Sequence, residues 1–329
     1  MGDSTCSQLA LVTGITGQDG YYLASRLANH GYRVIGTSRT LKCSSLPRLK
    51  DLIDSNALVI EKLDLVDAKA VQSIIDEYKP ELVFHLSGQS SVGKSFQDPE
   101  ETFSSIVNTT LHLLDAISQN SITSRIFIAG SSEIFGLNQS SPVTCSSPTN
   151  PQSPYGQAKA AALNLVREYR NSYGIYACTG ILFNHESPLR PKHFVSQKII
   201  TGACAIAKGE LEKLYVGNLS TERDWGWAPE YVQAMERMLT REEPKDFIIA
   251  TGQLNHLEDF IAQAFTEVGL EWQKHVVIDK QLFRPSDGSH PVADINETTQ
   301  HLGWTATTTM TGVVKKMVDA CQCRMYKYG

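Results

Sequence analysis

A glycine-spaced turn between an apolar strand and an amphipathic helix restricts the fold of this chain more than any other feature. Residues 9–13 predict a buried strand and residues 20–30 predict a helix, and Gly14, Gly17 and Gly20 lie at the junction. Glycines at this place allow a tight turn, close approach of a pyrophosphate and close helix–sheet packing. The N–H groups at a helix start bind phosphate. We therefore expect a dinucleotide-binding βαβ unit here.

The pattern that follows the turn predicts a doubly wound parallel α/β Rossmann sheet, because strand and helix patterns alternate regularly. Strands are expected at residues 33–36, 57–61, 81–86, 125–129 and 176–182, and helices at residues 66–78, 100–118 and about 155–171. Later helices at residues 193–208, 229–239, 257–268 and 309–321 are joined by loops rich in Arg, Pro, Asp and Asn. This change predicts a Rossmann domain at residues 1–182 and a smaller C-terminal α/β substrate lobe at residues 183–329. Segments of the chain can be exchanged between the domain and the lobe.

Bulk composition argues against several classes of function. The chain has 329 residues and a formal net charge of −5, so no bulk attraction to nucleic acid or to an anionic membrane is expected. The N-terminus lacks a basic stretch followed by an apolar one, and no apolar run is long enough to span a bilayer. The seven cysteines and nine histidines are scattered without metal-type spacing. We expect a cytoplasmic protein with reduced thiols and no metal.

The end of the second strand indicates which dinucleotide binds. Sites for NAD usually carry Asp or Glu about 20 residues beyond the glycines, where the carboxylate holds the ribose hydroxyls. Here the strand runs into Gly-Thr-Ser-Arg39, and no acidic residue occurs before Asp51. An arginine at this position suits a 2′-phosphate, which favours NADP as cofactor; the alternative is a solvated basic loop.

A second constellation lies far downstream of the turn. Tyr155 and Lys159 are four residues apart, which places both on one face of a helix. A neighbouring ammonium stabilises a phenolate, so the pair can exchange a proton with a sugar hydroxyl while hydride moves to the cofactor. Ser131, at the end of a strand, is suited to orient that hydroxyl. Glu133 adds a carboxylate that can remove a proton next to a new ketone; the alternative is a solvated loop acid.

These motifs together resemble the extended short-chain dehydrogenases/reductases, and most closely the GDP-mannose 4,6-dehydratases. Nearly the whole chain takes part. The glycine turn is similar to that of the family, and residues 64–65 and 85–92 resemble its adenine-side and nicotinamide-side segments. Residues 180–188 (Gly-Ile-Leu-Phe-Asn-His-Glu-Ser-Pro), 194–198 and 223–226 follow at the family's spacing, and residues 283–287 match a late nucleotide-binding motif.

The resemblance implies an NADP-dependent conversion of GDP-mannose to GDP-4-keto-6-deoxymannose by internal hydride transfer, in a homodimer or a tetramer. The implied catalytic residues are Ser131, Glu133, Tyr155 and Lys159. The implied cofactor-binding residues are Gly14, Thr16, Gly17, Gln18, Asp19, Gly20, Arg39, Asp64, Leu65, Leu86, Ser87, Gln89, Tyr155 and Lys159. The implied substrate-binding residues are Asn184, Val195, Lys198, Arg223, Arg284 and Asp287.

The chain departs from the family pattern at three places. Ser131 stands where the family has Thr, and the motif around it also resembles that of related 4-keto-sugar reductases. Thr40 replaces an arginine that reaches a neighbouring subunit in the dehydratases, which bears on the tetramer. The chain is also shorter before Phe283. The alternatives are a GDP-4-keto-6-deoxy-sugar reductase or epimerase and, more remotely, a non-catalytic NADP-binding regulator.

Overall fold

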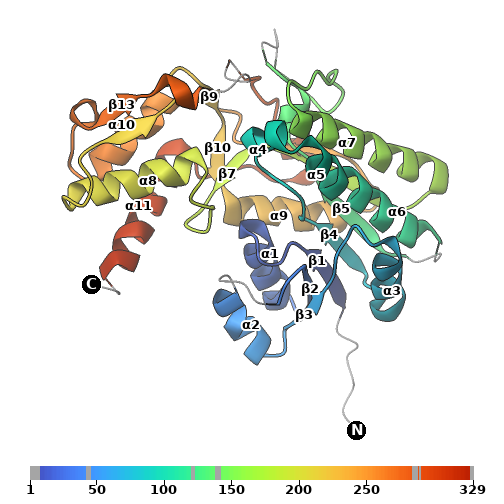
Figure 1. Cartoon of the computed structure of the whole chain (residues 1–329). Coiled ribbons are helices and arrows are strands. Elements are labelled where there is room, and N and C mark those ends of the chain that lie inside the picture. The colour runs from blue at the N-terminus through green and yellow to red at the C-terminus, as the bar shows by residue number, and fades with distance from the viewer. Residues whose placement is uncertain are drawn as a thin grey trace. The chain divides into compact units, whose positions relative to one another are not determined.

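The computed structural model describes residues 8–41, 46–119, 123–137, 142–283, 288 and 290–326 (Figure 1). These residues form two compact units of interleaved segments. The first unit holds the described residues of Met1–Ile134, Pro151–Leu182 and Val232–Phe247; the second holds those of Phe135–Asn150, Phe183–Tyr231 and Ile248–Gly329. Arg284 and Asp287, two of the predicted substrate residues, lie outside the described residues.

A seven-stranded sheet organises the first unit. Its strand order is β11-β6-β5-β4-β1-β2-β3, and the pairings of β1 with β2 and β4, of β2 with β3, and of β5 with β4 and β6 are all parallel. The strands are β1 (Leu9–Thr13), β2 (Arg33–Ser38), β3 (Leu58–Lys62), β4 (Leu82–His85), β5 (Arg125–Ala129), β6 (Ala177–Leu182) and β11 (Phe247–Ile249). The predicted α/β Rossmann class is confirmed, and the six predicted strands lie within two residues of the observed bounds. Strand β11 was not predicted, because three apolar residues carry no period.

Helices cover the sheet of the first unit. Its helices are α1 (Gln18–Asn29), α2 (Lys50–Asp54), α3 (Ala68–Tyr78), α4 (Val92–Gln97), α5 (Pro99–Phe103), α6 (Thr109–Gln119) and α7 (Pro154–Tyr173), joined by the end of α9 (Ala228–Leu239). Side chains of α3, α6 and α7 form one core with the apolar residues of β1, β2, β4 and β5. The close pairing of α6 with α7 is visible in Figure 1. This core holds the second half of α7, and the start of the helix packs in a smaller cluster through Tyr155, Ala158 and Ile106.

Two helix predictions need correction in detail. The helix expected at residues 100–118 is helical throughout, but a π-helical turn at Ser104–Asn108 separates α5 from α6. A period of 3.6 residues cannot reveal such an inserted residue. The helix expected to begin at Val66 begins at Ala68 instead, because the Asp67 side chain accepts hydrogen bonds from the N–H groups of Lys69 and Ala70. Helix α4 was not predicted at all.

The second unit combines helices with short two-stranded sheets. Its helices are α8 (Val195–Ala207), α10 (Leu257–Glu267) and α11 (Met310–Tyr326), which pack around one apolar core. Three two-stranded sheets accompany them: β7 (Asn184–Glu186) with β10 (Trp225–Trp227), β8 (Leu214–Val216) with β13 (Val276–Ile278), and β9 (Glu222–Arg223) with β12 (Asn255–His256). Two of the predicted substrate residues lie in these sheets, Asn184 in β7 and Arg223 in β9.

Candidate active site

The glycine turn leads directly from β1 into α1. Gly14 has a φ of 72°, and a Cβ there would lie 3.0 Å from the backbone of Leu86 and Ser87. A Cβ at Gly20 would collide with the carbonyl oxygen of Gly14. Gly17 is the N-cap of α1 and gives the helix no side-chain cap. A close-packed glycine cradle that ends at an uncapped helix start suits the pyrophosphate of a dinucleotide.

Two arginines accompany the turn. Arg39 is exposed and follows directly on the last residue of β2. Arg48, which sequence reasoning did not place in the site, donates hydrogen bonds to the carbonyl oxygens of Thr16 and Gly17. Its guanidinium lies 5.9 Å from the centroid of the Tyr21 ring. Arg48 therefore holds the outer side of the turn in shape, a role that no sequence pattern revealed.

A buried hydrogen-bonded chain joins β1, β4 and α6 below the turn. Thr13 Oγ1 accepts from the N–H groups of Leu86 and Ser87 at 3.2 and 3.3 Å, so its own hydrogen goes to His85 Nδ1 at 2.8 Å. His85 Nε2 then donates to Thr109 Oγ1 at 3.1 Å, and that hydroxyl donates to Ser105 O at 2.8 Å. Because the two main-chain N–H groups can only donate, the direction of each later bond follows from them; the Thr109 hydroxyl also lies 3.4 Å from the carbonyl oxygen of Ile106.

The ring of His85 stays neutral within this chain. Burial, together with the charge of Lys159, lowers the pKa of His85 to about 3. A neutral ring with its hydrogen on Nε2 is the form that the neighbouring hydroxyls require. His85 is the first residue of the segment at residues 85–92 that resembles the family's nicotinamide side. The sequence pattern of that segment gave no reason to assign this histidine a role of its own.

The predicted adenine-side residues lie at the end of β3. Asp64 is exposed, and its carboxylate accepts a hydrogen bond from the N–H of Val66 at 3.1 Å. Leu65 is buried in the core that α3, α6 and α7 share with the sheet, and its carbonyl oxygen lies 2.9 Å from His112 Nδ1. The exposed carboxylate of Asp64 and the main chain beside it are the groups here that a ligand can reach.

Tyr155 and Lys159 stand in the first two turns of α7, as the sequence predicted. Ser153 caps the helix by accepting from the N–H of Gly156 at 3.0 Å, and Pro154 occupies its first position. The Lys159 ammonium donates to the carbonyl oxygen of Ala129 at 2.6 Å and lies 5.8 Å from the centroid of the Tyr155 ring. Burial lowers the pKa of Lys159 to about 8, so the amine is still mostly charged at neutral pH.

Ser131 and Glu133 follow the end of β5 and face this helix start. Ser131 is buried, its hydroxyl oxygen accepts from the N–H of Glu133 at 3.3 Å, and Ser132–Ile134 forms a short 3-10 helix. A Cβ at Gly156 would lie 2.7 Å from the carbonyl oxygen of Glu133. Because Gly156 follows Tyr155 directly, this contact brings the backbone of Glu133 against the first turn of α7. The first unit thus gathers all four predicted catalytic residues around one strand end and one helix start.

The described substrate residues belong to the second unit. Asn184 opens β7 opposite Trp225 of β10, and Arg223 lies in β9. Val195 is the first residue of α8, and Lys198 lies one turn later; both are half-buried. These four residues come from two separate two-stranded sheets and one helix start within the same unit.

Two buried carboxylates position those elements, and sequence reasoning missed both roles. Glu186 accepts a hydrogen bond from Ser196 at 2.7 Å and pairs with Arg190 at 3.2 Å, which ties the first turn of α8 to the end of β7. Asp224 accepts from the N–H groups of Thr251 and Gly252 and from the Thr251 hydroxyl. Burial nevertheless raises the pKa of Asp224 to about 6. Sequence alone shows neither the burial nor the partners.

Other classes of site find no support in the described part of the chain. Within it, no group of three or more His, Cys, Asp or Glu side chains is arranged to hold a metal ion. His185 and Glu186 are neighbours in β7 and have partners within the protein: the His185 ring stacks on Tyr231 at 4.6 Å, its Nδ1 lies 2.8 Å from the carbonyl oxygen of Phe183, and Glu186 pairs with Arg190. Among the described helices, none has the length and apolar character that a bilayer crossing requires.

Comparison with known proteins places this geometry in a family. The model of the family described as GDP-mannose 4,6 dehydratase matches residues 11–317. The chain is 38% identical over 322 residues to GDP-mannose 4,6 dehydratase 1 of Arabidopsis thaliana, covering 95% of this chain and 89% of that protein. This chain belongs to the GDP-mannose 4,6-dehydratase family. The family's enzymes are lyases, and a nicotinamide dinucleotide is their typical cofactor.

Other relatives match this chain over a similar length. The human GDP-mannose 4,6 dehydratase is 36% identical over 337 residues, covering 95% of this chain and 91% of that protein. Among solved structures, UDP-glucose 4-epimerase of Thermotoga maritima superposes with a TM-score of 0.86 at 19% identity, covering 97% of this chain and all of that one. At this identity the superposition supports the extended short-chain dehydrogenase/reductase fold alone. The family assignment rests on the family model and the curated relatives.

Proposed function

We propose that this member of the family catalyses the NADP-dependent dehydration of GDP-mannose to GDP-4-keto-6-deoxymannose. The observation that carries the proposal is the contact between the backbone of Glu133 and the first turn of α7, the turn that carries Tyr155 beside Lys159. An alcohol dehydrogenase needs the tyrosine and the lysine. A dehydratase also needs a base for the carbon next to the new ketone, and Glu133 supplies one.

Tyr155 and Lys159 perform the first proton transfer in this proposal. The phenolate of Tyr155 takes the proton of the sugar 4-hydroxyl, and Ser131 orients that hydroxyl. The Lys159 ammonium stabilises the phenolate because it is held beside the ring by the Ala129 carbonyl. A nicotinamide dinucleotide held at the glycine turn would supply the redox chemistry, as a store for the hydride that moves from carbon 4 to carbon 6.

Glu133 performs the elimination. The 4-ketone acidifies the hydrogen on carbon 5, the carboxylate removes it as a proton, and the 6-hydroxyl leaves with that proton as water. The proton first taken by Tyr155 is returned to carbon 5 when carbon 6 regains hydride. One water is lost, the phenolate is restored and no net oxidation occurs, so the atoms and electrons balance.

The second unit supplies groups for the nucleoside diphosphate. Lys198 and Arg223 carry cationic side chains that suit pyrophosphate oxygens, and Arg284 is proposed to join them. Asn184 and Val195 are proposed to contact the rest of the nucleotide sugar. The buried ties of Glu186 and Asp224 support the proposal, because they hold the elements that carry these residues.

The test is incubation of the purified protein with GDP-mannose and a catalytic amount of NADP. The expected product has lost one water, and the amount of NADPH does not change as product accumulates. A stoichiometric change in NADPH would contradict dehydration and support a 4-keto-sugar reductase, which the Ser131 motif also resembles. Tight NADP binding without turnover of any nucleotide sugar would support the regulatory alternative.

The preference for NADP over NAD is proposed to reside in Arg39. This arginine is exposed at the end of β2, where an NAD site carries a carboxylate. Arg39→Ala is expected to raise the Kd of NADP about tenfold, as loss of one charge-assisted hydrogen bond implies. The Kd of NAD should change less than about twofold. Fluorescence titration measures both constants, and Arg33→Ala, an exposed arginine on the same strand, is the matched control. A wild-type protein that binds NAD more tightly than NADP contradicts the proposal.

The oligomeric state stays a prediction from the family. We propose a homodimer, and a tetramer is the alternative. Thr40 bears on this choice, because it stands in the loop where the dehydratases carry a subunit-bridging arginine. Sedimentation velocity of the full chain distinguishes the two assemblies.

A further inference from the structure

The loop after β4 is enclosed between two special backbone features of the first unit. On one side, Leu86 and Ser87 meet Gly14 of the glycine turn at a distance that leaves no room for a Cβ. On the other side, a Cβ at Gly88, whose φ is 128°, would lie 3.0 Å from the carbonyl oxygen of Ser105 in the π-helical turn. The shape of residues 86–91 therefore depends on both neighbours, and it forms a wall of the proposed dinucleotide site.

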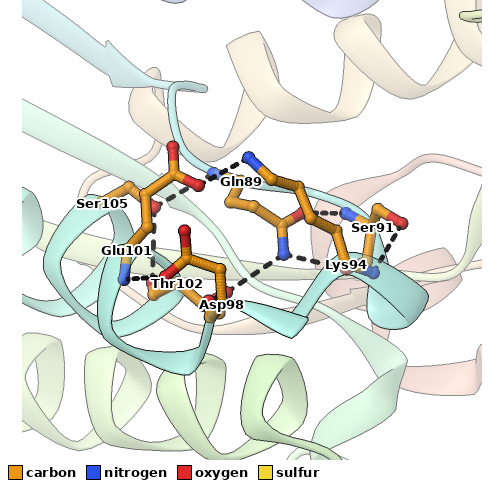
Figure 2. Close-up of polar contacts among 7 residues, drawn as sticks. All are labelled: Gln89, Ser91, Lys94, Asp98, Glu101, Thr102 and Ser105. Atoms are coloured by element: carbon orange, nitrogen blue, oxygen red, sulfur yellow. Dashed lines mark hydrogen bonds and ion pairs between the residues drawn. The ribbon is translucent and has the colours of Figure 1, made fainter. Parts of the chain in front are cut away.

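The side chain of Gln89 closes this loop with its whole amide (Figure 2). Its Oε1 accepts from the N–H of Ser91, and its Nε2 donates to the carbonyl oxygen of Ser91 at 2.8 Å and to Thr102 Oγ1 at 3.1 Å. The Thr102 hydroxyl spends its own hydrogen on the carbonyl oxygen of Asp98 at 2.7 Å, so it can only accept from Gln89. Both amide hydrogens of Gln89 are thereby used inside the protein.

The main chain of Gln89 is engaged as well. Its N–H donates to Ser105 Oγ at 3.2 Å, so the residue joins α5 through Thr102 and the π-helical turn through Ser105. The Ser105 carbonyl oxygen accepts from Thr109, the last member of the chain that begins at Thr13. Ser105 of the π-helical turn thus contacts the loop directly at Gln89 and is linked through Thr109 to His85, the residue before the loop.

We propose that Gln89 is a positioning residue of the dinucleotide site and acts by holding the loop at residues 86–91 in its binding shape before the cofactor arrives. This inference rests on the proposed cofactor site. It assigns to Gln89 a role other than direct contact, since its amide and main-chain hydrogens are spent on Ser91, Thr102 and Ser105. When the loop is already ordered in the free protein, cofactor binding does not carry the entropic cost of ordering it. The affinity for the cofactor is therefore higher.

Removal of the amide is expected to loosen the free loop and to weaken cofactor binding together. In Gln89→Ala, the Kd of NADP should rise roughly tenfold, while kcat at saturating NADP stays within about twofold of wild type. Hydrogen exchange of the peptide that covers residues 86–91 should be at least about tenfold faster without cofactor, and saturating NADP should restore protection. A residue that only contacts the cofactor would leave exchange in the free protein unchanged.

A double-mutant cycle with Thr102→Val locates the effect. If Gln89 acts through Thr102, the two substitutions together should raise the Kd of NADP less than the product of their separate effects. Gln89→Glu provides a second variant if Gln89→Ala does not fold. Its carboxylate keeps an acceptor for the Ser91 N–H but turns a second acceptor toward Ser91 O and Thr102, so it should bind NADP no better than Gln89→Ala.

The matched control comes from the same segment. Lys94 and Glu101 form an exposed ion pair at 2.5 Å beside the Gln89 contacts (Figure 2), and Lys94→Gln should leave both the Kd and the exchange unchanged. A raised Kd with unchanged exchange in the free protein, or a fully additive cycle, overturns the inference. A wild-type chain that binds neither NAD nor NADP overturns the proposed function as well, whereas a binding-competent wild type with unaffected Gln89 variants overturns this inference alone.

Discussion

Tyr155→Phe is expected to lower kcat for product formation by roughly a thousandfold or more, with a small change in the Kd of NADP. The substitution removes the phenolic oxygen that accepts the 4-hydroxyl proton, and general acid–base groups contribute about 10²–10⁴ in rate. The ring itself is buried and packs with Ile106, Ala158 and Ala162, so phenylalanine keeps that packing. Because the first proton transfer is lost, no absorbance of reduced nicotinamide should appear after mixing with substrate.

The matched control is Tyr169→Phe. Tyr169 lies on the same helix, is buried to the same extent as Tyr155 at 8% exposure, and stacks on Tyr173 away from the strand end that carries Ser131. Its kcat should stay close to that of wild type. A Tyr155→Phe protein that retains more than about a tenth of wild-type kcat would rule out the phenol as the proton acceptor.

The same pair sets the expected behaviour at alkaline pH. Burial lowers the pKa of Lys159 to about 8, and its charged form is the one that stabilises the phenolate. As pH rises through about 8, the ammonium loses its proton and the support for the phenolate declines, so kcat should fall on the alkaline side. Steady-state rates measured across this pH range give the apparent pKa of the decline in kcat. This value belongs to Tyr155 and Lys159 as a coupled pair.

The sequence predicted most of the sheet and of the cluster that we propose as catalytic, because both depend on local patterns. Gly14 and Gly20 appear in the turn where the close backbone contacts require glycine, and Tyr155 and Lys159 share a helix face through their spacing. The start of α7 was predicted near Tyr155, and in the structure Ser153 caps this helix and Pro154 is its first residue. Each of these features is written in a few consecutive residues.

What the sequence could not predict depends on contacts between distant residues. Arg48 reaches back to the turn across more than thirty positions, and Glu186 is buried because Arg190 and Ser196 surround it. The role of Gln89 depends on a hydroxyl in α5 whose hydrogen is already committed. Neither the hydrophobic periodicity nor the residue type shows which acceptor a given hydrogen bonds to. The roles of Arg48, Glu186 and Gln89 are therefore visible only in the structure.

Glu133→Gln is expected to block water loss by roughly a thousandfold while it leaves the first oxidation step possible. The amide has nearly the shape of the carboxylate but cannot take the proton from carbon 5, and the loss lies within the usual contribution of a general base. Tyr155 and Lys159 remain in place, so hydride can still leave carbon 4. After mixing with GDP-mannose, absorbance of bound reduced nicotinamide should therefore rise and persist, in contrast to Tyr155→Phe.

This contrast makes Glu133 the decisive position for the reaction type. Glu133→Asp retains a carboxylate one methylene shorter and should recover part of the rate, while Glu168→Gln, an exposed glutamate on α7, should match the wild type. A reductase or an epimerase does not remove the carbon 5 proton to expel water, so neither predicts a stalled oxidised sugar. If Glu133→Gln releases water at the wild-type rate, the carboxylate beside Tyr155 serves another purpose and the elimination step must be assigned to a different group.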